Sequence, residues 1–178
     1  MSNLDSVIYT DGREFFKELE EKYIKHDRGL FILTPSGAGK TYYCKNQEVQ
    51  NWIDGDEIYF ETKAEPPVES KWWDKGYQVI NRVEQRCDVI TAQVVDRGFW
   101  IMGSINHWLK PDAIVLPPIS TLMERVKVRE NNEYVGGLKE EHMDQMIQHM
   151  GIIRNWLVEY GVPEYKSIEE AVESLTSY

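Results

Sequence analysis

Residues 34–41 read Thr-Pro-Ser-Gly-Ala-Gly-Lys-Thr, a run whose residue types and spacing suit the binding of phosphate groups. Small residues let backbone N–H groups converge on an anion, and a helix that begins at this point adds its positive end. Lys40 has the reach for the outer phosphates of a nucleotide, and the hydroxyl of Thr41 is a ligand for Mg²⁺. We expect the nucleotide to be held by Ser36, Gly37, Ala38, Gly39, Lys40 and Thr41.

This run departs at one position from the phosphate-loop pattern G-x-x-x-x-G-K-[ST], because Thr34 replaces the first glycine. Glycine tolerates backbone angles that threonine disfavours, so we expect a slightly different turn. The alternative is a glycine-rich turn that binds nothing. The context favours phosphate binding, because the apolar run 30–33 predicts a strand before the loop and residues 40–48 predict a helix after it.

Asp54 and Asp56, separated by Gly55, follow a second short predicted strand at 51–54. One carboxylate beside a nucleotide's phosphates can orient Mg²⁺, and we assign that role to Asp54. Another can accept the proton of an attacking hydroxyl, and we assign that role to Asp56. The alternative is an ordinary Asp-Gly turn. Many P-loop proteins have a magnesium-binding aspartate at the end of the third strand, but here that strand is predicted to end at Gly103-Ser104. The role of holding Mg²⁺ therefore falls more strongly on Asp54.

Arg125 and Arg129 lie one helical turn apart and precede a segment rich in asparagine and glycine. Arginines that close over a transferring phosphoryl group neutralise its developing charge. We therefore predict a lid at 119–140, with a solvated basic helix face as the alternative.

A second pair of arginines, Arg82 and Arg86, lies on the polar side of a long predicted helix, just after Trp72 and Trp73. Arginines and aromatic rings can together hold the phosphate and base of an acceptor, which makes residues 57–98 a candidate acceptor-binding insertion. Alternatively, the tryptophans are core and the arginines are surface residues.

Predicted helices and strands alternate along the chain, and the strands are apolar without strict alternation. Both features are typical of a parallel sheet covered on both faces by helices, with ligands bound beyond the carboxyl ends of the strands. The other predicted strands are 99–102, 113–116 and 162–165, and the other helices are 11–26, 75–97, 119–130, 139–160 and one capped by Ser167; residues 57–72 are expected to be irregular.

The 178 residues, 42% of them hydrophobic, suit one compact domain spanning 1–178. A formal net charge of −10 disfavours a broad grip on a nucleic-acid backbone but allows contact with one nucleotide or a strand end. Cys44 and Cys87 have no metal-like spacing, which indicates reduced thiols in a cytoplasmic protein. We expect no export signal and no membrane span.

With these features together, the chain resembles small P-loop kinases, the group of nucleoside monophosphate, shikimate, gluconate and phage polynucleotide kinases. The resemblance rests on residues 34–41, Asp54-Gly55-Asp56, Gly103-Ser104 and Glu-Arg-Val-Lys-Val-Arg at 124–129. It implies a three-layer α/β/α fold of the P-loop NTPase type, with a parallel sheet of about five strands and a helical lid. The Asp-Gly-Asp-Glu-Ile run also looks like phage kinases of nucleotides or of hydroxymethylpyrimidines in DNA, which would act in the host cytoplasm.

The resemblance implies an ATP- and Mg²⁺-dependent kinase that phosphorylates a hydroxyl of a nucleoside, nucleotide or DNA-type acceptor. In that reading the residue matching Asp54 supports magnesium, the one matching Asp56 contacts the hydroxyl, and Arg125 and Arg129 match lid arginines. Two alternatives stay open: a nucleoside monophosphate kinase, and a non-catalytic nucleotide-binding module. The acceptor, the donor base and the oligomeric state are not defined by the sequence.

Overall fold

The computed structural model describes residues 9–131 and 143–177, and the side chains of 129–131 lie outside its description. A five-stranded parallel sheet runs in the order β2-β3-β1-β4-β5. The chain divides into two compact units, Met1–Phe31 with Asn46–Leu109 and Ile32–Lys45 with Lys110–Tyr178. The strands are β1 (Leu30–Leu33), β2 (Trp52–Asp54), β3 (Trp100–Gly103), β4 (Ala113–Val115) and β5 (Glu164–Tyr165).

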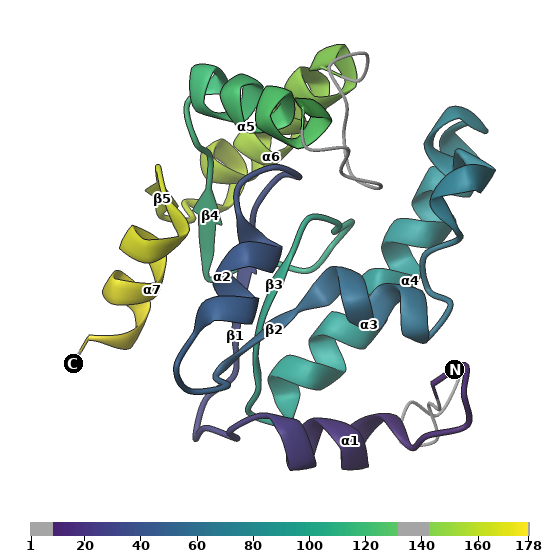
Figure 1. Cartoon of the computed structure of the whole chain (residues 1–178), viewed down its shortest axis with the longest axis vertical. Coiled ribbons are helices and arrows are strands. Elements are labelled where there is room, and N and C mark those ends of the chain that lie inside the picture. Colours follow the sequence, from purple (N-terminus) through teal and green to yellow (C-terminus); the bar gives the residue numbers. More distant parts are fainter. Residues whose placement is uncertain (1–8, 132–142, 178) are drawn as a thin grey trace. The chain divides into compact units, whose positions relative to one another are not determined.

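Seven α-helices lie in the described part of the chain (Figure 1). They are α1 (Phe15–Lys22), α2 (Lys40–Asn46), α3 (Gly55–Glu61), α4 (Tyr77–Asp96), α5 (Ile119–Asn131), α6 (Met143–Tyr160) and α7 (Ile168–Thr176), with short 3-10 turns η2 (Val68–Ser70) and η3 (Trp72–Asp74). None of the helices described is long and apolar enough to cross a membrane.

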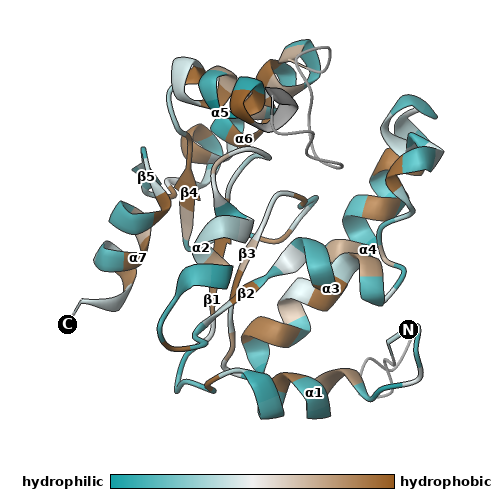
Figure 2. Ribbon diagram, viewed as in Figure 1, coloured by the Kyte–Doolittle hydropathy of each residue, from teal (hydrophilic) through white to brown (hydrophobic). Residues whose placement is uncertain are grey.

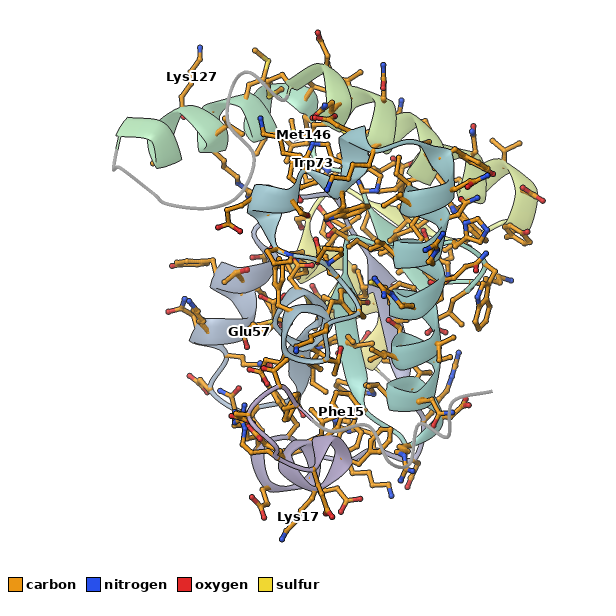
Figure 3. All side chains as sticks on the ribbon, turned by 90° about the vertical axis from the view of Figure 1, so that its right-hand side faces the viewer. Phe15, Lys17, Glu57, Trp73, Lys127 and Met146 are labelled. Carbon is orange, nitrogen blue, oxygen red and sulfur yellow. The ribbon has the colours of Figure 1, made fainter. Side chains whose placement is uncertain are left out.

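In the first unit, α3 and α4 pack against β3. Helix α4 buries Val83, Cys87, Ile90 and Val94, which recur every three or four residues and so share one face. Helix α1 is likewise two-sided: Phe15 points inward and is 1% exposed, whereas Lys17 points away from the helix (Figure 3). Burial of these apolar faces holds the helices on the sheet.

In the second unit, β4 pairs with both β1 and β5, and α7 packs against β4 and β5. The hydrophobic colour of β4 contrasts with the hydrophilic turns of α7 in Figure 2. The predicted cap of α7 is confirmed, because the Ser167 hydroxyl accepts a hydrogen bond from the backbone N–H of Glu170.

The predicted order of strands and helices is confirmed, with two corrections. The first helix ends at Lys22 rather than at 26, because the N–H groups of Ile24 and His26 donate to the carbonyls of Gln50 and Gly98 instead of continuing the helix. The expectation that 57–72 is irregular is wrong for its first part, where α3 extends to Glu61. Of the segment rich in asparagine and glycine that was predicted to follow α5, Asn131 is the last residue of the helix, and residues 132–137 lie outside the described part of the chain.

Candidate active site

The phosphate-loop candidate follows the carboxyl end of β1 and leads directly into α2, as predicted. Gly37 and Gly39 both have positive φ angles, +86° and +98°, which L-residues with a side chain rarely adopt. Lys40 begins α2 and is only 6% exposed. The strand, the glycine turn and the helix therefore place the residues predicted to bind the nucleotide in a local arrangement that suits an anion.

The two glycines also lie close to α5. A Cβ atom built on Gly37 would lie 3.6 Å from the Leu122 side chain, and one built on Gly39 would lie 3.5 Å from Nη1 of Arg125. Nη1 of Arg125 donates a hydrogen bond of 3.2 Å to the carbonyl oxygen of Gly37. The structure thus brings the predicted arginine of α5 to the loop that the sequence assigned to phosphate.

Other basic residues of α5 and α6 lie elsewhere. Lys127 points away from α5 (Figure 3), and Arg154 on α6 is exposed. Arg129 belongs to α5, but its side chain lies outside the description, as do residues 132–140 of the predicted lid. Of the two arginines predicted for a lid, Arg125 is therefore the one whose side chain the structure describes.

Thr34, the departure from the phosphate-loop pattern, does not have a positive φ angle, so its backbone does not need a glycine. Its side chain is fully buried, and its hydroxyl has no hydrogen-bond partner among the described residues. An unpaired buried hydroxyl is energetically unfavourable. Threonine at this position is compatible with the turn but adds a polar atom that the described structure does not satisfy.

Asp54, Gly55 and Asp56 form the junction between β2 and α3. Asp54 is 3% exposed and caps α3, since its Oδ1 accepts a hydrogen bond of 3.1 Å from the N–H of Asp56. The run is therefore the start of a helix, not only a tight turn. Glu57, three residues after Asp54, completes the Asp-x-x-Glu pattern typical of such a start.

Two glycines let the start of α3 approach the end of β3. A Cβ atom on Gly55 would lie 2.8 Å from the carbonyl oxygen of Met102, and one on Gly103 would lie 2.7 Å from the hydroxyl of Tyr59. That hydroxyl is hydrogen-bonded to Oγ1 of Thr91 at 2.5 Å. Burial is the main cause that raises the pKa of Tyr59 well above its usual value, so this ring is a neutral support beneath the junction.

Sequence reasoning missed two features of this region: the hydrogen bond between Ser104 and Asp56, and the buried carboxylate of Asp88. Ser104 lies just beyond β3 and donates a hydrogen bond of 3.2 Å to Oδ1 of Asp56. Asp88 on α4 is fully buried, and its Oδ2 accepts hydrogen bonds from the N–H groups of His107, Trp108 and Leu109 at 2.5 to 3.0 Å. Burial raises the pKa of Asp88, and these backbone donors oppose that rise. The sequence signal for Ser104 was its place directly after the third predicted strand; its contact with Asp56 follows from the parallel register of β2 and β3.

The candidate acceptor-binding residues are divided between surface and interior. Arg82 and Arg86 are exposed on α4, as predicted. Trp72 is 9% exposed and packs edge-on against Trp73, but its indole N–H has no partner within the described part of the chain. Packing in the interior explains the burial of the Trp72 ring but not its indole N–H, which lacks a described partner. The side chains of Arg82 and Arg86 are exposed and so accessible to a ligand.

A magnesium ion fits this chain only together with a nucleotide. The described residues contain no group of three or more His, Cys, Asp or Glu side chains that could hold a metal. Mg²⁺ takes few protein ligands and usually keeps waters and substrate phosphates. Thr41 and Asp54, to which the sequence assigns the ion, each carry oxygen of that kind; Thr41 belongs to α2 and Asp54 to the junction of β2 and α3.

Comparisons with known proteins support the fold. No protein-family model and no curated protein matches the chain. A solved structure of shikimate kinase from Acinetobacter baumannii in complex with shikimate is similar, with a TM-score of 0.53 and 14% sequence identity over 84% of this chain and 93% of that chain. Together with the five parallel strands, this likeness confirms the predicted three-layer α/β/α fold of the P-loop NTPase type.

Proposed function

We propose that this protein is a kinase that transfers the γ-phosphoryl group of ATP to a hydroxyl group of a nucleoside, nucleotide or DNA-type acceptor. The observation that carries the proposal is the glycine loop between β1 and α2, with Lys40 at its end and Arg125 on the Gly37 carbonyl. The likeness to a shikimate kinase structure agrees with phosphoryl transfer to a small molecule.

The loop is the donor half of the proposed site. The backbone N–H groups around Gly37 and Gly39 bind the phosphate oxygens, and Lys40 neutralises the outer phosphates. In this proposal α5 is the part of the lid that closes on the loop, and Arg125 moves from the Gly37 carbonyl to the transferring group. Mg²⁺, held through Thr41 and Asp54, would supply charge neutralisation at the phosphates.

Asp56 serves the acceptor half. The acceptor's hydroxyl oxygen forms a bond to the γ-phosphorus while the bond from that phosphorus to the bridging oxygen of the β-phosphate breaks. The hydroxyl proton passes to the Asp56 carboxylate, and ADP leaves with the bonding electron pair. Arg82, Arg86 and the neighbouring tryptophans of residues 57–98 bind the rest of the acceptor.

The test is transfer from ATP labelled at its γ-phosphate to a panel of nucleosides, nucleotides, sugars, and plain or hydroxymethylated DNA. We expect a hydroxyl acceptor to become labelled, and the Asp56→Asn variant to lose transfer while still binding ATP. Glu57→Gln is the matched control, because Glu57 is the exposed neighbour of Asp56. Full activity of Asp56→Asn would refute the role given to this carboxylate.

A second candidate acceptor is the phosphate of a nucleoside monophosphate, favoured by the exposure of Arg82 and Arg86 on one face of α4. Labelling of monophosphates but not of free hydroxyl acceptors, with loss in Arg82→Ala or Arg86→Ala, would establish it. Tight ATP binding without transfer to any acceptor would instead indicate a nucleotide-binding module.

A further inference from the structure

We infer that Ser104 is a positioning residue that holds the Asp56 carboxylate in the orientation required for proton transfer, an inference that rests on the proposed function. Oγ of Ser104 donates to Oδ1 of Asp56 at 3.2 Å, across 48 residues of sequence. Ser104 is 6% exposed and Asp56 is half-buried, so the hydrogen bond is partly shielded from water.

The sheet register explains why these two residues meet. Asp54 pairs with Met102 in the parallel ladder between β2 and β3. Asp56 follows Asp54 by two residues and Ser104 follows Met102 by two residues, so both lie just beyond the carboxyl ends of the paired strands β2 and β3. Gly55 and Gly103, the residues in between, lack the side chains that would hold the two segments apart.

Ser104 is itself held by a fixed loop. After Ser104 the chain continues through His107, Trp108 and Leu109, whose N–H groups all donate to one carboxylate oxygen of Asp88 on α4. Nδ1 of His107 also lies 3.0 Å from a carboxylate oxygen of Glu84, one turn before Asp88. Four contacts to α4 therefore restrict the loop that carries Ser104.

The chemical consequence concerns orientation. A carboxylate on a short side chain can rotate about its terminal bond, and only some rotations aim a lone pair at the acceptor's hydroxyl. The donor from Ser104, combined with the cap that fixes the backbone at Asp56, selects one of them. Loss of this bond should lower the rate of transfer, not the binding of either substrate.

The experiment measures kcat and acceptor KM for the parent, Ser104→Ala, Asp56→Asn and the double variant. We expect Ser104→Ala to lower kcat roughly 10- to 100-fold, the range for a hydrogen bond to a charged group, with little change in KM. The residual kcat of Asp56→Asn should not fall further when Ser104→Ala is added, because Ser104 acts through Asp56. Ser177→Ala, which removes an exposed serine bonded locally to the Glu173 carbonyl at the end of α7, is the control and should keep parental rates.

A second readout is independent of turnover: the ¹³C resonance of the Asp56 carboxyl should move in Ser104→Ala while the unfolding midpoint stays. A parental kcat in Ser104→Ala, or an undiminished effect of this change in Asp56→Asn, overturns the inference and leaves the proposed function intact. Absence of transfer by the parent protein across the panel overturns both.

Discussion

Two regions of the molecule, each described within its own unit, are built on different physical principles: the phosphate loop, proposed as the donor half, and the Asp54–Asp56 junction, proposed as the acceptor half. The loop obtains its shape from the backbone, through positive φ angles at Gly37 and Gly39. The junction is shaped by side-chain hydrogen bonds, from the Asp54 cap to the Ser104–Asp56 bond.

This difference matches what each half is proposed to do. A triphosphate is large and carries several charges, so it is best met by many backbone N–H groups and by cations. A proton acceptor must instead keep one carboxylate in one orientation, which requires neighbouring side chains to be fixed. The difference therefore predicts that substitutions in the first unit act on stability and rate, and those in the loop on nucleotide affinity.

The largest expected effect is in the acidic half. Asp88→Ala removes the acceptor of three backbone N–H groups, and at about 1 kcal/mol or more for each unsatisfied donor the unfolding free energy should fall by about 3 kcal/mol or more. Denaturant titration measures this. Asp96→Ala, at the exposed end of the same helix, should change stability by less than about 0.5 kcal/mol. Equal effects in the two variants would contradict the loop-holding role.

Gly55→Ala should rank next. The added Cβ would lie 2.8 Å from the Met102 carbonyl oxygen. Such overpacking should lower the free energy of unfolding by about 1 to 3 kcal/mol. Gly151 lies in α6 with nothing within 4 Å of a built Cβ, so Gly151→Ala should raise stability by about 0.5 to 1 kcal/mol. Thermal unfolding of both variants decides, and a stable Gly55→Ala protein would show that the junction is looser than described.

In the loop, Gly37→Ala should separate affinity from stability. There is room for a methyl group, but a φ angle of +86° costs an L-residue about 1 to 2 kcal/mol. Gly12 has φ +87° and open space in the first unit, so Gly12→Ala should lose similar stability. We expect ATP affinity, measured by calorimetry, to fall only in Gly37→Ala; a fall in both would argue against a specific role for the loop.

Effects of similar or smaller size are expected at two buried threonines, Thr34 in the second unit and Thr91 in the first. Thr34→Val removes a hydroxyl without a described partner and should raise the unfolding free energy by about 1 kcal/mol. Thr91→Val removes the partner of the Tyr59 hydroxyl and should lower it by about 1 to 2 kcal/mol. If Thr34→Val is destabilising when measured by denaturant titration, the hydroxyl of Thr34 is satisfied by water.

The same difference, between a loop shaped by its own backbone and a junction shaped by side-chain hydrogen bonds, determines what could be predicted from the sequence. The phosphate loop is a local pattern, in which residues 34–41 are contiguous and their chemistry follows from spacing. The strands and most helices were predicted from apolar runs and from the glycines that end them. Helix α3 was missed because the Asp54-x-x-Glu57 start signal was interpreted only as a turn.

The Ser104–Asp56 bond and the contacts of Asp88 could not be predicted from local patterns. Ser104 is 48 residues from Asp56, and the three N–H groups bound by Asp88 lie 19 to 21 residues from it. Contacts of this kind depend on the register of paired strands and on which face of a helix meets a loop. Arg125 was predicted as a lid residue, but its bond to the Gly37 carbonyl needed the structure.

The central claim is that the loop between β1 and α2 binds the phosphates of ATP, and calorimetric titration of ATP into the parent, Lys40→Ala and Lys45→Ala proteins tests it most directly. Lys40 is nearly buried at the end of the loop, whereas Lys45 is exposed in the last turn of the same helix. A charge-assisted contact is worth about 2 kcal/mol, so we predict that Lys40→Ala weakens binding roughly 30-fold and that Lys45→Ala leaves it unchanged. Equal affinity of the parent and Lys40→Ala proteins would contradict the account.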